Sequence, residues 1–484
     1  PIDDISTLVN NCDEKVWDIY KNGLTCTINQ ADSDLGKQLV MRYKPHSLAE
    51  MAAWVAAIRP GFASLLNTFI DREKYSTGVP ELDKILTDTF HFMIYQECIM
   101  SYLIWLGIEE KDTYDIIKKI SKKKFKQEEL EALKEQLKNS WIKHIGEEKG
   151  FEDTWQVVED AARYSFNASH ALSVAIDSLY GAYLKSHYPL EYYTVVLSLY
   201  SDDMERTAKL TEELKYFGIK IEQVKFGKSG PDYTMDKDNN VIYKGISSIK
   251  YCNAQIALEL QELSNNSYKD FTQLLGDINS KTSVNSRQLT ILIGLNFFSK
   301  FGHNKYLMDV TKIYDKLATA KIISKKKLEE LGLTEFLMKK YAGRETASQY
   351  RDLDNEGLIF ELASRLEDKP MSVVEQVKFE KEYLQYVVYS NPRVNHSFYI
   401  VTDYKTFKEV RKPYCTLHNI KTGEDIKTRV TSVKTFENNP FGEYSILRVD
   451  GFTKKHKKKC VNGTWQETEE LEDILDNYEV IRNE

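Results

Sequence analysis

The sequence predicts a predominantly α-helical protein of several domains that ends in a small β domain. Its 484 residues exceed what one hydrophobic core usually organises, so we expect two to four domains. In most segments up to residue 390, apart from residues 217–250, apolar residues recur every three or four positions, as they do in amphipathic helices. Beyond Asn391 this spacing stops. Short alternating runs at 398–401, 428–436 and 444–449, separated by Asn-Pro-Phe-Gly and Asp-Gly turns, indicate strands.

The composition is that of an ordinary globular protein, with 42% hydrophobic and 29% charged residues. No apolar run reaches the roughly 18 residues of a membrane span, and the polar start PIDDISTLVNN is not a signal peptide, so no membrane partner is expected. The six cysteines are widely spaced, which predicts neither zinc binding nor disulfides and favours a cytoplasmic protein. Because the chain begins at Pro1, we expect it to be a piece of a longer protein.

Basic residues gather in three runs, although the net charge is −7. The runs are KKISKKKFK at 118–126, KIISKKK at 321–327 and KKHKKK at 454–459. An acidic protein does not coat nucleic acid with its whole surface, and solvated faces are the commoner explanation of single runs. Three runs in one acidic chain favour a directed path for DNA.

Helix signals are clear near the start of the chain. We expect helices over residues 13–22 and 34–43, and a third over 47–58 that opens with a capping box of Ser47 and Glu50. Arg59, Pro60 and Gly61 end this third helix. Residues 128–141 predict an amphipathic helix that buries Leu130, Leu133, Leu137 and Trp141.

The segment 164–189, YSFNASHALSVAIDSLYGAYLKSHYP, organises the rest of the chain. Its polar start offers Asn167 or Ser169 as the cap of a buried helix, which Pro189 closes. A helix N-terminus with free amides beside Ser169 and His170 suits a phosphate group. An ordinary capped core helix is the competing interpretation.

Further along, residues 190–213 read as helix and residues 217–250 as short strands. Asp236 and Asp238 form a D-x-D within DKDNN, which we interpret as a hairpin turn, because no partner carboxylate lies in a nearby strand. Residues 311–390 read as Lys- and Glu-rich helices.

The segment 164–189 resembles a signature in the fingers of C-family DNA polymerases, the bacterial polymerase III alpha subunits. That family reads Phe-Asn-Lys-Ser-His, then a helix, then Leu-Lys-x-His-Tyr-Pro. The chain differs at Ala168, which replaces the family's Lys and removes a positive charge where a triphosphate is expected. The matching positions are Phe166, Asn167, Ser169, His170, Leu184, Lys185, His187, Tyr188 and Pro189.

Other segments extend the resemblance. They are Gln30, Ser33 and Pro45, the Arg59 turn, Phe69 to Arg72, and Tyr95, Gln96 and Glu97 with Met100. Lys118 and Lys119 stand for two family arginines, followed by the matching Lys122, Lys123 and Lys124. Because arginine clamps phosphate with two parallel hydrogen bonds and lysine is a point charge, we expect a looser grip on nucleotide.

Residues 245–263 and 285–298 resemble the family's helix-hairpin-helix region. Tyr251, Cys252 and Asn253 stand where the family has Gly-x-Gly, so close backbone approach to DNA is hindered and we interpret this element as architectural. The ending KFEKEYLQYVVYSNP resembles the connection to the family's last domains, of which an OB-like barrel is the family expectation.

The resemblance implies four domains and two sets of binding residues. The domains are fingers at 1–215, a small strand segment with the helix-hairpin-helix-like region at 216–310, a helical connector at 311–390, and a small OB-like β domain at 391–484. The residues implied for the incoming nucleotide are Arg59, Lys118, Lys119, Lys122, Lys123, Asn167, Ser169 and His170. Those implied for DNA are Lys124, Lys126, Lys185 and Lys250.

No catalytic or metal-ligating residue is predicted. Polymerisation uses Mg²⁺ ions held by aspartates of a palm, and we expect those ions outside this chain. The D-x-D pairs Asp32/Asp34 and Asp352/Asp354 do not sit in strand-like patterns.

The function implied is that of the fingers and C-terminal portion of a phage-like replicative DNA-directed DNA polymerase, a nucleotidyltransferase inactive without its palm. The partners implied are primer–template DNA, dNTP, a palm-containing segment or subunit and a sliding clamp, although residues 349–353 match a clamp peptide poorly. The alternatives are a non-catalytic, polymerase-derived protein that binds DNA or the replisome, and a helical interaction scaffold.

Overall fold

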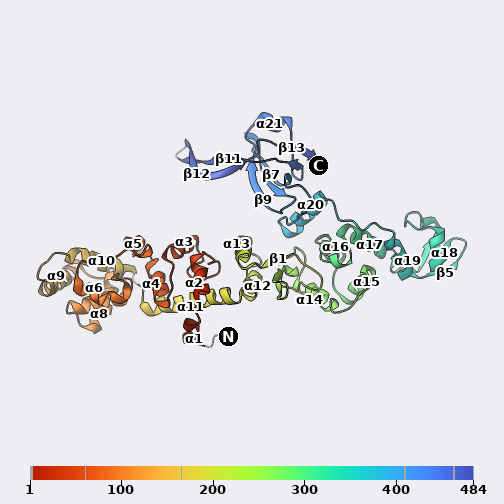
Figure 1. Cartoon of the computed structure of the whole chain (residues 1–484). Helices are drawn as coiled ribbons and strands as arrows, with labels where there is room; N and C mark the ends of the chain where they lie inside the picture. Colours follow the sequence, from red (N-terminus) through yellow and green to blue (C-terminus); the bar gives the residue numbers. More distant parts are fainter. Residues whose placement is uncertain (1–3, 60–61, 165, 408–409, 462–463, 483–484) are drawn as a thin grey trace. The chain divides into compact units, whose positions relative to one another are not determined.

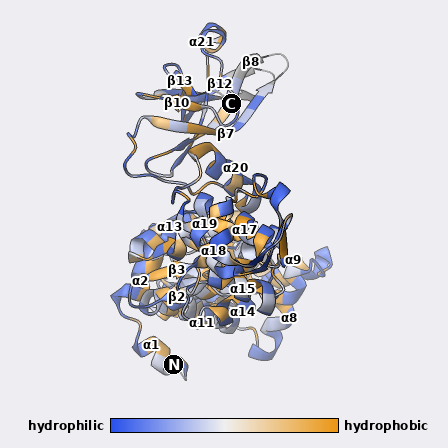
Figure 2. Ribbon diagram, turned by 90° about the vertical axis from the view of Figure 1, so that its right-hand side faces the viewer, coloured by the Kyte–Doolittle hydropathy of each residue, from blue (hydrophilic) through white to orange (hydrophobic). Residues whose placement is uncertain are grey.

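The protein is mostly helical and multidomain, as predicted (Figure 1). The computed structural model describes residues 4–59, 62–164, 166–407, 410–461 and 464–482. The chain divides into two compact units, Pro1–Lys220 and Ile221–Glu484. Figure 2 shows helices in which hydrophobic and hydrophilic residues mix, the pattern of helices that bury one side. Within the described ranges no helix is long and apolar enough to cross a membrane.

The first unit is built from helices around two hydrophobic cores. One core gathers α2, α3, α4 and α11, and the other gathers α6 to α10. Tyr95 packs against both cores. The helices are α1 (Ile5–Asn10), α2 (Glu14–Lys21), α3 (Asp34–Tyr43), α4 (Leu48–Ala57), α5 (Leu66–Ile70), α6 (Pro80–Ile85), α7 (Gln96–Trp105), α8 (Glu110–Ser121), α9 (Gln127–Ile145), α10 (Phe151–Tyr164), α11 (Ala168–His187), α12 (Pro189–Leu199) and α13 (Met204–Leu214).

Side-chain caps fix most of the helix starts that the sequence predicted. Asp13, Ser33 and Ser47 each accept a hydrogen bond from a first-turn amide of α2, α3 and α4. The predicted capping box at Ser47 is wrong in one of its two hydrogen bonds, the one from the Ser47 amide to the Glu50 side chain. The Glu50 carboxylate accepts from the His46 amide at 2.9 Å and pairs with Arg72 at 2.7 Å. An arginine twenty-two residues away therefore takes the carboxylate that a local pattern assigned to the cap.

The helix predicted over 190–213 is interrupted at residues 200–203, and Asp203 caps the second half, α13. Pro189 ends α11 as predicted and also begins α12, where its missing amide hydrogen costs nothing.

The second unit begins with a small sheet and four helices. Strands β1 (Lys220–Glu222), β2 (Thr234–Asp236) and β3 (Val241–Tyr243) pair in the order β1-β3-β2. The predicted turn between β2 and β3 is confirmed, because Asp236 accepts from the Asn239 amide and pairs with Lys228 at 2.8 Å. Helices α14 (Ala254–Leu263), α15 (Phe271–Lys281), α16 (Ser286–Gly294) and α17 (Asn304–Leu317) then surround one hydrophobic core.

The segment 311–390 is not wholly helical, which corrects the prediction. It contains the three-stranded sheet β4-β6-β5, formed by β4 (Ile322–Ser324), β5 (Ala342–Glu345) and β6 (Gln349–Leu353). Tyr350 of β6 is fully buried there, so its burial outweighs the local helical pattern. The helices are α18 (Glu335–Tyr341), α19 (Asn355–Ser364) and α20 (Val373–Leu384).

The C-terminal domain holds a seven-stranded sheet of order β11-β12-β9-β8-β7-β10-β13. Among the described residues of this sheet, β12 and β9 are the one parallel pair. A strand was expected over 428–436, but β9 ends at Arg429 and α21 (Val433–Asn438) follows. The OB-like assignment stays a prediction. The strands are β7 (Phe398–Phe407), β8 (Val410–Asn419), β9 (Asp425–Arg429), β10 (Ile446–Arg448), β11 (Thr453–Val461), β12 (Thr464–Ile474) and β13 (Glu479–Arg482).

A buried histidine ties this sheet to the segment after α20. The His418 ring is 2.7 Å from Asp425 Oδ1 through Nδ1 and 2.7 Å from the Tyr389 carbonyl oxygen through Nε2. Both neighbours are acceptors, so the doubly protonated ring donates twice. Burial lowers the pKa of His418, but the hydrogen bonds and the charge of Asp425 raise it more, and the net shift is upward.

We predict that this tie weakens as pH rises. A folded-state pKa above the unfolded value gives stability that is complete below about pH 6.5 and is lost as pH rises through the folded pKa. Hydrogen exchange of β8 and β9, normalised for intrinsic rates, should show this loss in the native chain and not in His418→Gln. His396→Gln, which changes an exposed histidine, should keep the native profile. Identical pH profiles for the native chain and His418→Gln would contradict the assignment.

Candidate nucleotide and DNA interface

Two segments that are far apart in the sequence meet where α11 begins. Tyr95 and Phe166 form a parallel β-bridge, and the Gln96 amide donates to the Phe166 carbonyl at 3.0 Å. The bridge joins the start of α7 to the start of α11. The Tyr-Gln-Glu and Phe-Asn-x-Ser-His motifs, which are sequence-distant, therefore form one structural element.

The N-terminus of α11 is capped twice. Asn167 Oδ1 accepts from the His170 amide at 3.1 Å, which confirms Asn167 as the cap. Glu97 of α7 accepts from the Ala168 amide at 3.0 Å and from Asn167 Nδ2 at 2.8 Å. The positive end of a helix favours a carboxylate in this position. The Glu97 carboxylate therefore occupies part of the helix N-terminus at which the sequence predicted a phosphate group.

Three side chains lie in contact beside this helix start. The Arg59 guanidinium lies 4.5 Å from the centre of the Phe166 ring, whose centre lies 4.8 Å from that of the His170 ring. His170 and Ser169 are exposed, and Arg59 is half-buried. Its Nε is buried with no hydrogen-bond partner among the described residues. Pro60 and Gly61, which were predicted to form a turn with Arg59, lie outside the described part of the chain.

Six lysines of the first basic run form an exposed group, which we call the lysine segment. None of the six forms an ion pair with a carboxylate of the described residues, and all six are solvent-exposed. Only the first two are helical, because α8 ends at Ser121 and Lys123 adopts a left-handed conformation with φ of 51°. The lysine segment consists of Lys118, Lys119, Lys122, Lys123, Lys124 and Lys126.

The run at 454–459 does not offer comparable free charge. It forms β11, which pairs with the acidic strand β12. Lys454 pairs with Asp473 at 2.7 Å and Lys457 with Glu470 at 2.8 Å. In the run at 321–327, Lys325 pairs with Glu345 at 2.5 Å. Of the three basic runs, the lysine segment is therefore the one in which no lysine pairs with a carboxylate of the described residues.

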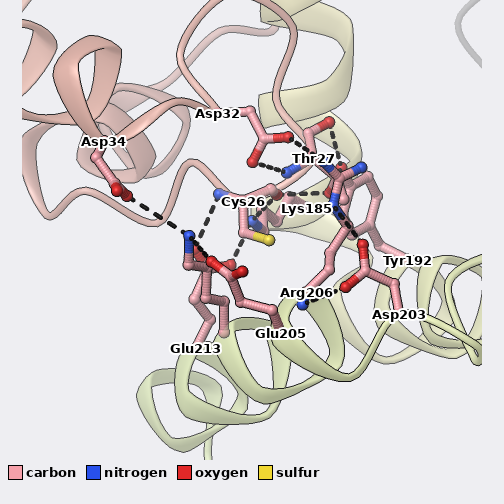
Figure 3. Close-up of polar contacts among 11 residues, drawn as sticks. Cys26, Thr27, Asp32, Asp34, Lys185, Tyr192, Asp203, Glu205, Arg206 and Glu213 are labelled. Carbon is pink, nitrogen blue, oxygen red and sulfur yellow. Dashed lines mark hydrogen bonds and ion pairs between the residues drawn. The ribbon is translucent and has the colours of Figure 1, made fainter.

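Lys185 was predicted to contact DNA, but the structure places it in the interior (Figure 3). Its side chain is fully buried, and Nζ donates to the carbonyl oxygens of Leu24 and Cys26 at 2.7 and 2.8 Å. Nζ also donates to Glu213 Oε2 at 2.5 Å. Burial lowers the pKa of Lys185, and Glu213 opposes this shift. We therefore leave Lys185 out of the proposed DNA surface.

Lys250, in the second unit, is exposed and lies before the first hairpin of the helix-hairpin-helix region. Its ammonium group is 5.2 Å from the centre of the Tyr251 ring, and the Arg287 guanidinium is 3.5 Å from the same ring. Tyr251 has φ of 70°, the left-handed conformation that glycine adopts most easily. The chain therefore keeps the turn that the missing glycines would favour, and Asn253 caps α14 directly after it.

The two D-x-D pairs take structural roles. Asp32 accepts from the Thr27 amide at 2.9 Å and pairs with Arg206 at 3.3 Å (Figure 3). Asp352 lies in strand β6, which corrects the prediction for that pair, but Asp354 caps α19. Among the residues that the structure covers, no group of three or more His, Cys, Asp or Glu side chains is arranged to hold a metal.

Sequence reasoning missed two residues that hold α11 at its two ends. Glu97 was recognised only as part of a motif, and its position at the start of an apolar helical run gave no sign of a contact at α11. Glu213 was the unseen partner of Lys185. The described residues of this helical unit thus include an exposed lysine segment at the end of α8 and the exposed Ser169 and His170 at the start of α11.

Comparison with known proteins shows which families parts of this chain resemble. Residues 4–144 match the family model of the bacterial DNA polymerase III alpha subunit finger domain, and residues 218–308 match a helix-hairpin-helix motif. Both regions were predicted, and the resemblance to the fingers-to-C-terminal portion of DNA polymerase III alpha subunits is confirmed.

The chain is similar to DNA polymerase III alpha subunits of several bacteria. It is 29% identical to that of Aquifex aeolicus over 299 residues, which are 59% of this chain and 25% of the relative. It is 28% identical to that of Campylobacter jejuni over 303 residues, 60% of this chain and 25% of the relative. It is 25% identical to that of Ureaplasma parvum over 315 residues, which are 64% of this chain and 32% of the relative. The chain thus spans about a quarter to a third of these relatives.

We predict that the buried pair of Lys185 and Glu213 stabilises the first unit strongly. Lys185→Met or Glu213→Gln alone should lower the free energy of unfolding by about 3–5 kcal/mol, because each leaves an uncompensated buried group. The double variant should lose less free energy of unfolding than the two single variants lose in total. Thermal and urea unfolding would measure these losses. Lys209→Met, which breaks an exposed pair, should leave the melting temperature nearly unchanged. Single variants as stable as this control would contradict the prediction.

Proposed function

We propose that this chain is the fingers and C-terminal portion of a replicative DNA-directed DNA polymerase. The observation that carries the proposal is the meeting of the two motifs at the start of α11, within a unit whose residues 4–144 match a polymerase finger domain. The exposed His170, the stacked Arg59 and the free charges of the lysine segment supply groups that bind phosphate.

For the incoming dNTP, the proposal assigns the triphosphate to the exposed side of the α11 start. His170 and Ser169 can donate hydrogen bonds to phosphate oxygens, and the Arg59 guanidinium has an unpartnered Nε nearby. Asn167 holds the turn through the His170 amide. The remaining residues proposed for the nucleotide are Lys118, Lys119, Lys122 and Lys123 of the lysine segment.

For primer–template DNA, the proposal keeps Lys124 and Lys126 in the first unit and Lys250 in the second. Exposed lysines bind the DNA backbone by neutralising phosphates and releasing counterions, without reading sequence. The chemistry of nucleotide transfer would come from Mg²⁺ and palm aspartates on another segment of the protein or on another chain. The described residues present no carboxylate group that fits those ions, so no catalytic step is assigned to them. A sliding clamp remains a proposed partner of the complete polymerase.

A second candidate function is a non-catalytic, polymerase-derived protein that binds DNA or the replisome. The Glu97 carboxylate at the start of α11 favours it, because a fixed negative charge there repels a triphosphate. Ala168 in place of a family lysine points the same way. The two candidates share DNA binding and differ in nucleotide use.

We predict that the lysine segment binds DNA electrostatically. Replacing Lys122, Lys123 and Lys124 by Gln should weaken binding to primer–template, because fewer phosphates of the duplex are neutralised. The slope of log K against log salt should become less negative by about 0.9 for each phosphate contact that the variant loses. Fluorescence anisotropy with a labelled primer–template between low and moderate salt measures both effects.

The matched control removes three lysines that already have carboxylate partners. The three are Lys134, Lys138 and Lys209, which pair with Glu152, Glu148 and Glu205. Their change to Gln removes three positive charges, as many as the change in the lysine segment does. This control should keep most of the native slope. Equal slopes for the two triple variants would show that only net charge matters and would remove the lysine segment from the interface.

We predict that His170 contacts the nucleotide. In a complex completed with the palm of a related alpha subunit, His170→Ala should weaken dNTP binding by about 1.5–3 kcal/mol, the range for a charged hydrogen bond. Its melting temperature should hardly change, because the ring is exposed. Primer extension as a function of dNTP concentration measures the first effect, and thermal unfolding the second.

Two results would decide against this assignment. A variant that melts several degrees lower and still uses dNTP normally would make His170 structural. A palm-completed chain that binds primer–template and never extends it would favour the non-catalytic candidate. Leu199→Ala, on an exposed apolar residue of α12, serves as the neutral variant in both assays.

A further inference from the structure

A cavity of about 620 Å³ opens in the first unit, outside the interface described above. It lies between the end of α3, helix α5 and two loops at 72–76 and 87–92. Its volume is that of a small-molecule site, for which about 300–1,000 Å³ is usual. Its walls are mainly aromatic and are formed by Tyr43, Phe69, Tyr75, Phe90 and Phe92.

Four of these rings form fixed walls, and the fifth is free. Tyr43 stacks on Phe69 with ring centres 4.9 Å apart, and Tyr75 stacks on Phe92 at 4.3 Å. Phe90 makes no ring contact within the described part of the chain, and 46% of its surface is exposed. An exposed aromatic face above an aromatic cavity is available for stacking with a flat ligand.

The rim of the cavity is held in an uncommon backbone conformation. Arg72, Phe90 and His91 have φ of 55°, 56° and 68°, a region that residues other than glycine seldom adopt. His91 Nδ1 lies 2.9 Å from the Tyr75 carbonyl oxygen and so ties the two loops together. The cavity is therefore preformed and does not depend on a loop that orders only on binding.

The charges around the cavity favour a neutral ligand. The Arg72 guanidinium pairs with Glu50 at 2.7 Å and donates to the Tyr43 carbonyl at 2.9 Å, so its charge is used within the fold. Lys74 and Glu73, which also line the cavity, have opposite charges. A phosphate would find little net positive charge here. A nucleobase has two flat faces and a polar edge, which match the rings and this pair of side chains.

The cavity is close to the proposed nucleotide site along the chain. Phe92 precedes Tyr95 by three residues, and three residues span at most about 11 Å. We infer that the cavity receives one unpaired base of the template strand, stacked on Phe90. This inference rests on the proposed function, because DNA must be bound nearby to deliver the base.

The test uses primer–templates whose single-stranded template overhang carries either thymidines or abasic residues. Both overhangs have the same backbone charge, so they differ only in the bases. Phe90→Ala should weaken binding of the thymidine overhang about tenfold or more, the effect of removing one base–aromatic stack, and leave the abasic overhang unchanged. Phe90→Trp should restore binding. Leu199→Ala, an exposed apolar residue of the same unit, should behave as the native chain.

Each other outcome overturns the inference. If Phe90→Ala weakens both overhangs equally, or neither, no base is bound at this cavity. If it leaves DNA binding intact and weakens binding of a palm-containing segment, the cavity belongs to a protein partner. DNA binding that depends on the lysine segment and not on the bases leaves the proposed function standing without this site. No binding of either overhang at low salt removes both proposals.

Discussion

The first unit depends on one buried ion pair, between Lys185 and Glu213. A lysine without exposed surface is tolerated only when its charge and all its donors find partners, and here a carboxylate and two carbonyl oxygens meet that need. Tyr193 and the Cys26 amide donate to the same carboxylate. The pair thereby joins the loop before Asp32, the last turn of α11 and the end of α13 (Figure 3).

Helix α11 is consequently fixed at both ends. Lys185 holds its last turn, and Asn167 with Glu97 holds its first. Between these ends it packs against α2 and α4 in one hydrophobic core. The bridge from Phe166 to Tyr95 then connects it to the second core, from which the lysine segment projects. A helix held at both ends and bridged to the second core therefore fixes the position of the His170 side chain relative to Arg59 and Phe166.

Short sequence patterns predicted the features of the structure that depend on residues adjacent in the chain. The caps at Asp13 and Ser33, the turn at Asp236 and the exposure of the lysine segment all follow from short patterns. Contacts between residues far apart in the sequence were not predicted. These contacts determine which charged side chains are paired or buried. Glu50 pairs with Arg72, Lys454 and Lys457 pair with carboxylates of β12, and Lys185 is buried with Glu213. The candidate site was therefore predictable as a set of motifs, whereas its internal carboxylate and its buried lysine were not.

The loop between α8 and α9 has a practical consequence. A lysine-specific protease meets several exposed cleavage sites there, while both flanking helices bury residues such as Ile120 and Leu137 in the same core. A nick in this loop would leave the two fragments associated in a native-like complex. A strand bound to the lysine segment would shield these peptide bonds, so the rate of cleavage in this loop with and without DNA would report on the proposed binding.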